Sequence, residues 1–160
     1  MIEVDGGARH AARLAAVQAL YQMEISGDAA DDVTAEFTEF RFGREEEVTP
    51  GAPDQAFFAD IVHGVPARQQ EIDAAIAKCL AANWKLSRVD SLMRAILRAG
   101  AYELIARLDV PAKVVIDEYV GLTHVFDADA ETPFINAALD KLAHNKRAEE
   151  FGEKTPEGEF

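Results

Sequence analysis

The chain has 160 residues, of which 49% are hydrophobic and 28% are charged, and its formal net charge is −13 at pH 7. This hydrophobic fraction is typical of a globular protein and excludes wholesale disorder, while the single cysteine excludes a disulfide-stabilised fold. No apolar run reaches the roughly 18 residues that a membrane span requires, and the acidic amino end lacks the apolar segment of a secretory signal.

Charge is distributed unevenly along the sequence. Residues 24–60 contain eleven acidic residues and two arginines, whereas residues 85–113 contain six basic and three acidic residues. Residues 146–160 are acidic and almost free of apolar side chains, so we expect a disordered acidic tail there. We expect residues 1–7 to be a flexible amino end and residues 8–145 to form one helical domain. Because so acidic a protein repels nucleic acid, RNA binding requires a local cationic surface or a basic partner.

Helical periodicity dominates the sequence, and no convincing strand alternation is present. The expected helices are, in chain order, one that ends before Ser26, one over 31–42, a stretch over 55–82, one over 88–108, one opened by Pro111, and one with Thr132 as N-cap and Pro133 in its first turn. Pro66 predicts two helices or a kink within 55–82. Residues 43–54, with three consecutive glutamates and two prolines, form the one obvious internal loop. Six or seven amphipathic helices with short connections indicate an all-α bundle.

The sequence offers little support for an enzyme. It has no phosphate-binding glycine loop, nucleophile elbow or Cys-x-x-Cys pair. Cys79 lies beside Ile76 and Leu80 on an apolar helix side, which favours a small core residue over a nucleophile. We therefore expect no catalytic residues and no cofactor.

Two pairs of potential metal ligands have the i, i+3 spacing that places both side chains on one helix face. They are Asp60 with His63 and His124 with Asp127. Nothing in the sequence brings the two pairs together, so we interpret them as solvated or capping groups and expect no metal site.

Cationic and aromatic residues on the first helix carry more information. Arg9 and Arg13 are four residues apart and share a face, His10 is adjacent, and Arg13, Val17 and Tyr21 follow one line. Cations beside an exposed ring suit single-stranded RNA, in which phosphates meet cations and unpaired bases stack on rings. The alternative, which these residues alone favour, is a ring at the edge of the core with ordinary surface cations.

Arg94 and Arg98 also share a helix face. Arg98 is embedded in an apolar run, so we favour a structural role for it, in which it binds an acid on a neighbouring helix.

The order and spacing of several segments resemble the NusB family of transcription antitermination proteins. The matching segments are Arg9–Arg13 with Ala16–Tyr21, Phe57–Val65, Asn83–Asp90, Ala95–Leu104, Val110–Pro111, Val115–Val120 and Phe134–Lys141. Together they cover nearly the whole chain from about Arg9 to Leu142, and the ordered set is a strong signal.

The resemblance implies an all-α, NusB-like bundle of six to seven amphipathic helices in two packed sub-bundles, with residues 8–145 as the RNA-binding domain. It implies a cytoplasmic, non-enzymatic antitermination factor that acts with the ribosomal small-subunit protein NusE. Such a factor binds boxA RNA of ribosomal RNA operons and helps RNA polymerase to read through terminators. The RNA-binding residues that it implies are Arg9, His10, Arg13, Tyr21 and Phe134. The resemblance is also compatible with a homodimer.

Two rival interpretations remain open at this point. The first is a protein-only adaptor whose acidic face, residues 24–60, binds a basic partner without contacting RNA. The second is an RNA-modifying enzyme, because a NusB-like bundle also forms the amino-terminal domain of some ribosomal RNA cytosine methyltransferases. Those enzymes require a following catalytic domain, and this sequence ends at Phe160 without one.

Overall fold

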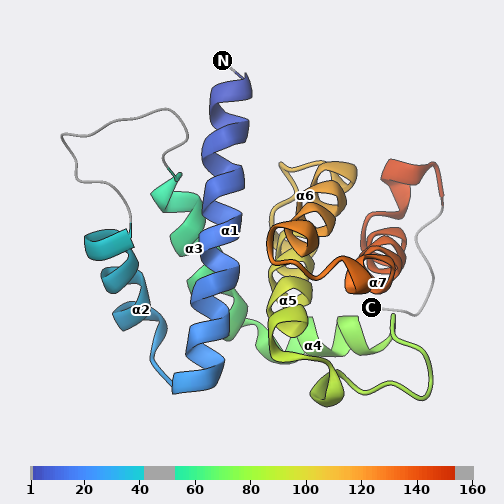
Figure 1. The fold of residues 1–160 in the computed structure, drawn as a ribbon. Coiled ribbons are helices and arrows are strands. Elements are labelled where there is room, and N and C mark those ends of the chain that lie inside the picture. Colours follow the sequence, from blue (N-terminus) through green and yellow to red (C-terminus); the bar gives the residue numbers. More distant parts are fainter. Residues whose placement is uncertain (1, 42–52, 154–160) are drawn as a thin grey trace. The chain divides into compact units, whose positions relative to one another are not determined.

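The computed structural model describes residues 2–41 and 53–153 (Figure 1). The chain divides into two units, Met1–Arg68 and Gln69–Phe160. Within the described ranges, every regular element is a helix and no β-strand occurs. This confirms the prediction of an all-α fold in two sub-bundles. None of the helices in those ranges is long and apolar enough to cross a membrane.

The first unit contains α1 (Ile2–Ser26), α2 (Ala30–Glu36), a π-helix (Phe37–Arg41) and α3 (Gln55–Ala67). Helix α1 packs along α3, and α2 packs against both. The buried side of α1 consists largely of small residues, which allow a close approach of the two helix axes; these are Ala12, Ala15, Ala16, Val17 and Ala19. Phe37 stacks on Phe58 with ring centroids 5.4 Å apart, and both rings are buried.

The second unit contains α4 (Gln69–Ala77), α5 (Ser91–Ala106), α6 (Ala112–Val125) and α7 (Thr132–Lys146), with short 3₁₀ helices at Leu86–Arg88, Asp129–Glu131 and Ala148–Phe151. Helix α5 is central and packs against α4, α6 and α7. Gly100 permits close packing of α5 on α7, because a Cβ there would lie 3.1 Å from a methyl group of Leu139. Ile96, Leu97 and Leu104 of α5 are completely buried in this core.

Several predicted helix boundaries differ from the structure. Helix α1 begins at Ile2, so it includes most of the segment predicted to be a flexible amino end; no proline there removes a backbone donor. The predicted break within 55–82 is confirmed, but it falls at Arg68, after α3 has continued through Pro66. Most of the predicted loop 43–54 lies outside the described residues.

Thr132 is not the N-cap of the last helix, as the sequence predicted. It is the first helical residue, and the N-cap, Glu131, makes no side-chain capping bond. The Thr132 hydroxyl instead lies 2.6 Å from the hydroxyl of Thr123, which is completely buried. The Thr123 hydroxyl donates to the Val120 carbonyl (2.7 Å), so its oxygen is left to accept from the Thr132 hydroxyl, which therefore points away from the end of its own helix.

The sequence predicted a disordered tail over residues 146–160, and the structure has regular elements in the first half of this segment. Lys146 ends α7, Ala148–Phe151 form a 3₁₀ helix, and Ala148 is buried. Residues 154–160 lie outside the described part of the chain. The physical reason for the order is Arg147, whose side chain is only 4% exposed.

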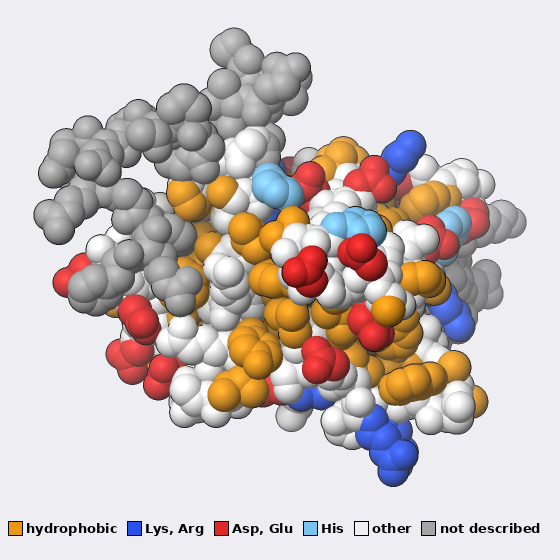
Figure 2. Space-filling model, viewed as in Figure 1, with side chains coloured by type: hydrophobic (Ala, Val, Ile, Leu, Met, Phe, Trp, Pro, Cys, Tyr) orange, Lys and Arg blue, Asp and Glu red, His pale blue; other side chains and the backbone are white. Residues whose placement is uncertain are grey.

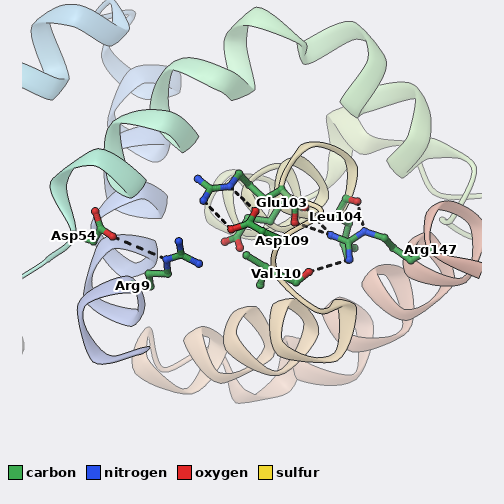
Figure 3. Close-up of polar contacts among 8 residues, drawn as sticks. Arg9, Asp54, Glu103, Leu104, Asp109, Val110 and Arg147 are labelled. Atoms are coloured by element: carbon green, nitrogen blue, oxygen red, sulfur yellow. Dashed lines mark hydrogen bonds and ion pairs between the residues drawn. The ribbon is translucent and has the colours of Figure 1, made fainter. Parts of the chain in front are cut away.

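Arg147 uses its whole guanidinium group to cap the carboxyl end of α5 (Figure 3). Its Nε donates to the Leu104 carbonyl (2.8 Å) and Nη2 donates to the carbonyls of Glu103 (3.1 Å) and Arg107 (2.9 Å). Its Nη1 donates to the Val110 carbonyl (2.9 Å) and to the Glu150 carboxylate. The carbonyls at a helix end lack intrahelical partners, so a positive group there is favourable.

Glu150 connects Arg147 to the start of α6. Its carboxylate accepts a hydrogen bond from the amide of Ala112, the first residue of α6 (2.8 Å). This backbone bond, together with the bond from Arg147, holds the pKa of Glu150 below its ordinary value, against the opposing effect of burial. The residues after α7 therefore tie the end of α5 to the start of α6.

His144 contacts Phe151 and Glu153, and its interaction with Glu153 depends on pH. Its ring stacks on Phe151 (3.9 Å between centroids), and Nδ1 lies 2.9 Å from the Glu153 carboxylate. The hydrogen bond to Glu153 raises the pKa of His144 above its ordinary value of 6.5, because it favours the protonated ring. The stabilisation from this pair is thus fully present below pH 6.5 and is lost as the pH rises through the raised, folded-state pKa.

We expect Glu153→Gln to lower the pKa of His144, measured by NMR titration of its ring protons. Asp129→Asn, which removes the partner of His124 (2.8 Å), is the control and leaves the pKa of His144 unchanged. An unaltered His144 pKa in the Glu153→Gln variant would contradict this assignment.

Candidate nucleic-acid interface

The two arginines predicted on one face of α1 lie over the same ring of α3. The guanidinium carbons of Arg9 and Arg13 are 4.6 Å and 5.0 Å from the ring centroid of Phe57, which is buried. This arrangement confirms that the i, i+4 spacing places both cations on one face. Arg13 is only 3% exposed, whereas the Arg9 side chain is 32% exposed. A cation over an aromatic face is attracted by the ring, so Phe57 helps to position both side chains.

Asp54 connects the amino-terminal end of α3 to α1. One of its carboxylate oxygens accepts a hydrogen bond from the Phe57 amide (3.0 Å) and thereby caps α3. The other lies 4.0 Å from Nε of Arg9 (Figure 3), and the Asp54 amide donates to the Ala8 carbonyl (3.0 Å). The capping bond fixes the carboxylate, which keeps a negative charge close to Arg9.

Tyr21 is exposed on α1, but the two residues that precede it on the same helix face are buried. Of the three residues on the predicted line, Arg13 and Val17 are buried and Tyr21 is 40% exposed. Ile25, one turn later, is 62% exposed, and His10 is exposed near the other end of α1. Tyr21 therefore presents an accessible ring that a base can stack on, without an adjoining exposed cation along the same line.

Phe134 belongs to the second unit, where it forms an aromatic pair. It lies in the first turn of α7, is half-buried, and has its ring 5.9 Å from that of Trp84 at an interplanar angle of 44°. Trp84 is 48% exposed. Trp84 was not among the RNA-binding residues predicted from the sequence, although it is an aromatic residue directly before exposed Lys85, at the start of the basic stretch 85–113.

Arg98 and Arg94 bind groups inside the second unit and stabilise its fold. The guanidinium group of Arg98 makes two bonds to the Asp73 carboxylate, 2.9 Å and 3.0 Å long, which confirms the role predicted for it and ties α5 to α4. Arg94 donates to the carbonyls of Leu86 (3.1 Å) and Ser87 (3.3 Å). These bonds orient the segment before α5, which includes Trp84 and Lys85, close in sequence to the two carbonyls.

A second buried polar contact links α5 to α6 in the same unit. The Tyr119 hydroxyl donates to the Glu103 carboxylate, and both side chains are completely buried. The contact gives the buried Glu103 carboxylate a hydrogen-bond donor inside the core.

The two predicted pairs of metal ligands lie in different units and have other contacts. His63 lies 3.2 Å from the Thr34 hydroxyl and 3.6 Å from Asp31, and His124 lies 2.8 Å from Asp129. In the part of the chain that the structure describes, no group of three or more potential metal ligands occurs.

Cys79 is half-buried and its thiol lies 3.4 Å from the Ala75 carbonyl. Burial raises its pKa, so the thiol stays protonated at neutral pH and is a poor nucleophile.

Similarity to known proteins extends over most of the chain. A model of the NusB family matches residues 10–144. The chain is 52% identical to the transcription antitermination protein NusB of Caulobacter vibrioides, with 87% of this chain and 94% of that protein covered. It is 51% identical to the protein of the same name from Rhodopseudomonas palustris, with 89% and 83% covered.

Solved structures agree with this relationship at the level of the fold. NusB of T. maritima is 27% identical, with a TM-score of 0.73 over 90% of this chain and 96% of that chain. A chain from a crystal structure of antitermination factors NusB and NusE in complex with dsRNA is 22% identical, with a TM-score of 0.69 over 84% and 94%. With the family model over most of its length and relatives about half identical to it, this chain belongs to the NusB family.

Proposed function

We propose that the chain is an RNA-binding transcription antitermination factor that acts with NusE on boxA RNA of ribosomal RNA operons and promotes read-through of terminators. Membership of the NusB family carries this proposal, because the relatives that are about 50% identical over most of the chain are antitermination proteins. The factor does no covalent chemistry, works in the cytoplasm, and joins the RNA polymerase antitermination complex.

A basic partner has a physical role in this proposal. The chain carries a net charge of −13 and repels RNA at long range. Joining NusE offsets that repulsion and adds phosphate contacts, each of which releases counterions and makes binding dependent on salt. We therefore expect weak binding by the chain alone and tighter binding with NusE.

The residues that we propose for RNA binding are Arg9, His10, Arg13, Tyr21 and Phe134. Tyr21 offers an exposed ring for an unpaired base, and Arg9 and His10 are accessible to phosphates. Because Arg13 is buried against Phe57, its contribution in this proposal is to hold α1 and Arg9 in place.

The protein-only adaptor is the second candidate, and the exposed acids of α2 favour it. Asp31, Asp32 and Glu36 are all exposed on this short helix, next to exposed Asp28. Such a face suits a basic protein and repels RNA.

Fluorescence anisotropy of labelled boxA RNA, with and without NusE and at two salt concentrations, separates the two candidates. The RNA factor shows weak binding alone, tighter binding with NusE, and weakening by salt. Binding to NusE with no RNA binding in either state would select the adaptor and overturn the proposal. Because the related NusB–NusE structure contains dsRNA, a duplex of equal length is included as a second probe.

Asp54→Asn tests whether the cap of α3 restrains Arg9. Asparagine caps a helix as well as aspartate does, so the substitution removes the negative charge near Arg9 and keeps the capping bond. Two charges 4 Å apart in water interact by about 1 kcal/mol, so we expect tighter RNA binding by up to about fivefold at low salt.

Asp109→Asn is the matched control, because Asp109 forms an exposed ion pair with Arg107 (3.0 Å) in the second unit. It leaves the RNA affinity unchanged. An Asp54→Asn variant that binds RNA like the unmodified protein, with unchanged stability in urea, would show that Asp54 does not restrain Arg9.

A further inference from the structure

The segment after α7 turns back to that helix at a single glycine. Gly152 follows the 3₁₀ helix Ala148–Phe151 and has a φ of 71°, in the left-handed region that glycine adopts without strain. In this turn the Glu153 amide donates to the Ala148 carbonyl (3.0 Å). The turn brings the Glu153 carboxylate to 2.9 Å from Nδ1 of His144, in the last turn of α7. The conformation of Gly152 therefore directs Glu153 to His144.

Two carboxylates face the ring of His144, one at each nitrogen. Both carboxylate oxygens of Glu153 lie 2.9 Å from Nδ1, and an Asp140 oxygen lies 3.7 Å from Nε2. A protonated imidazole has an N–H on both nitrogens, whereas a neutral one has one N–H and one lone pair. Only the protonated ring is therefore attracted by both carboxylates. Figure 2 shows histidine side chains beside acidic ones at the surface of the protein.

Charged groups on the elements around α7 have other partners. Arg147 and Glu150, in the segment after α7, bind each other. Glu153, through its hydrogen bond, and Asp140 raise the pKa of His144. Further pairs in the same unit are Asp73 with Arg98, Glu103 with Tyr119, Arg107 with Asp109 and His124 with Asp129, while Lys78, Lys141 and Lys146 act on the Cys79 thiol.

Phe151 adds an aromatic contact to the same histidine. Its ring stacks on that of His144, with centroids 3.9 Å apart and an interplanar angle of 19°. Phe151 and Glu153 flank Gly152, so a rotation of the backbone at the glycine moves one relative to the other. Arg147, in contrast, is held in the core by backbone carbonyls. The segment thus has a first part fixed by Arg147 and a second part, residues 151–153, attached to α7 through His144.

We propose that His144 is a pH-operated latch that holds residues 151–153 on α7. In the closed state, at low pH, the protonated ring binds Glu153 and Asp140 and stacks on Phe151. As the pH rises the ring loses its proton, and its attraction for the two carboxylates weakens.

The open state follows from this loss of attraction. Phe151 and Glu153 leave α7 by rotation at Gly152, whereas Arg147 keeps its hydrogen bonds in the core. The end of α5 is therefore capped in both states, and only the second part of the segment moves.

Nuclear Overhauser effects between the ring protons of His144 and Phe151 measure the closed state in the full-length protein. They are recorded from about pH 5.5 to about pH 8.5, on both sides of the ordinary histidine pKa. We expect the ratio of closed to open segment to fall about two- to fivefold as the pH rises, which is the factor by which an exposed ion pair shifts an equilibrium. The midpoint coincides with the titration of the His144 ring.

Gly152→Ala tests the hinge while every contacting side chain stays in place. Alanine is strained at a φ of 71°, so we expect weaker Overhauser effects to Phe151 and a His144 pKa that moves back toward 6.5. Gly121→Ala on α6 is the matched control, because a Cβ there meets nothing within 4 Å. It leaves both measurements unchanged.

His144→Phe keeps a ring for Phe151 but removes the titrating group, so we expect the Phe151 ring signals to be independent of pH. His124→Phe is its control, since His124 is an exposed histidine of the same unit that faces Asp129 (2.8 Å), and it retains the pH dependence.

Two results would overturn the latch. Overhauser effects of equal strength at both ends of the pH range, while His144 titrates, would show that the segment stays closed whatever the charge of the ring. Phe151 signals that change with pH in His144→Phe as they do in the unmodified protein would assign the change to another group.

Discussion

Arg147→Ala is expected to lower the free energy of unfolding by about 3 kcal/mol or more, because each buried carbonyl left without its donor costs about 1–3 kcal/mol. Arg147 donates hydrogen bonds to four backbone carbonyls and to the Glu150 carboxylate while almost completely buried. The alanine variant leaves those carbonyls without their donor and removes the positive group from the carboxyl end of α5.

Two further variants show whether the geometry of the guanidinium group, and not its charge alone, is responsible. Arg147→Lys keeps the charge but has three donors on one nitrogen in place of a planar fork, so we expect it to lose most of the same free energy. Arg107→Ala removes the exposed ion pair with Asp109 and costs less than about 1 kcal/mol.

Urea unfolding followed by far-ultraviolet circular dichroism measures all three variants. An Arg147→Ala protein with a midpoint close to that of the unmodified protein would show that the segment after α7 contributes little to the stability of the second unit.

Tyr21→Ala is expected to weaken binding of single-stranded RNA by about 1–3 kcal/mol, or roughly 5- to 150-fold in Kd, because stacking of a base on a ring has this magnitude. The slope of affinity against salt stays nearly constant, since the tyrosine carries no charge and contacts no phosphate. Tyr21 is 40% exposed, so a base can reach its ring without a change in the fold.

Ile25→Ala is the matched control for Tyr21→Ala. Ile25 lies one turn further along α1, is more exposed than Tyr21, and is apolar but has no ring. We expect its alanine variant to bind RNA like the unmodified protein, measured by anisotropy with NusE present. Equal affinities of the Tyr21→Ala and Ile25→Ala variants would exclude base stacking on Tyr21.

Arg9→Gln and Arg13→Gln distinguish a direct phosphate contact from support of the helix. Loss of a phosphate contact lowers the salt slope, whereas loss of a buried cation over Phe57 lowers the stability of the first unit. The sequence treats the two arginines alike because they share one helix face. Only the packing of α1 on α3 makes Arg13 buried and Arg9 partly exposed.

The sequence by itself determined the fold class and the family. Apolar residues repeat with helical spacing along most of the chain, and prolines and glycines mark the connections. Both patterns involve residues close together in the sequence, so they can be recognised without a structure. The structural role of Arg98 was also predictable, because a cation inside an apolar helix face needs an acid on its neighbour, and Asp73 supplies it.

The tertiary structure decided which polar groups have buried partners. Arg147 follows α7 in a segment so polar that its composition predicted disorder, yet the carbonyls at the end of α5, about 40 residues earlier, hold it in the core. Thr132 likewise turns to buried Thr123 instead of capping its own helix. Trp84 lies against Phe134, which is fifty residues later in the chain. Each of these contacts joins residues that are distant along the chain, and helical periodicity carries no information about such pairs.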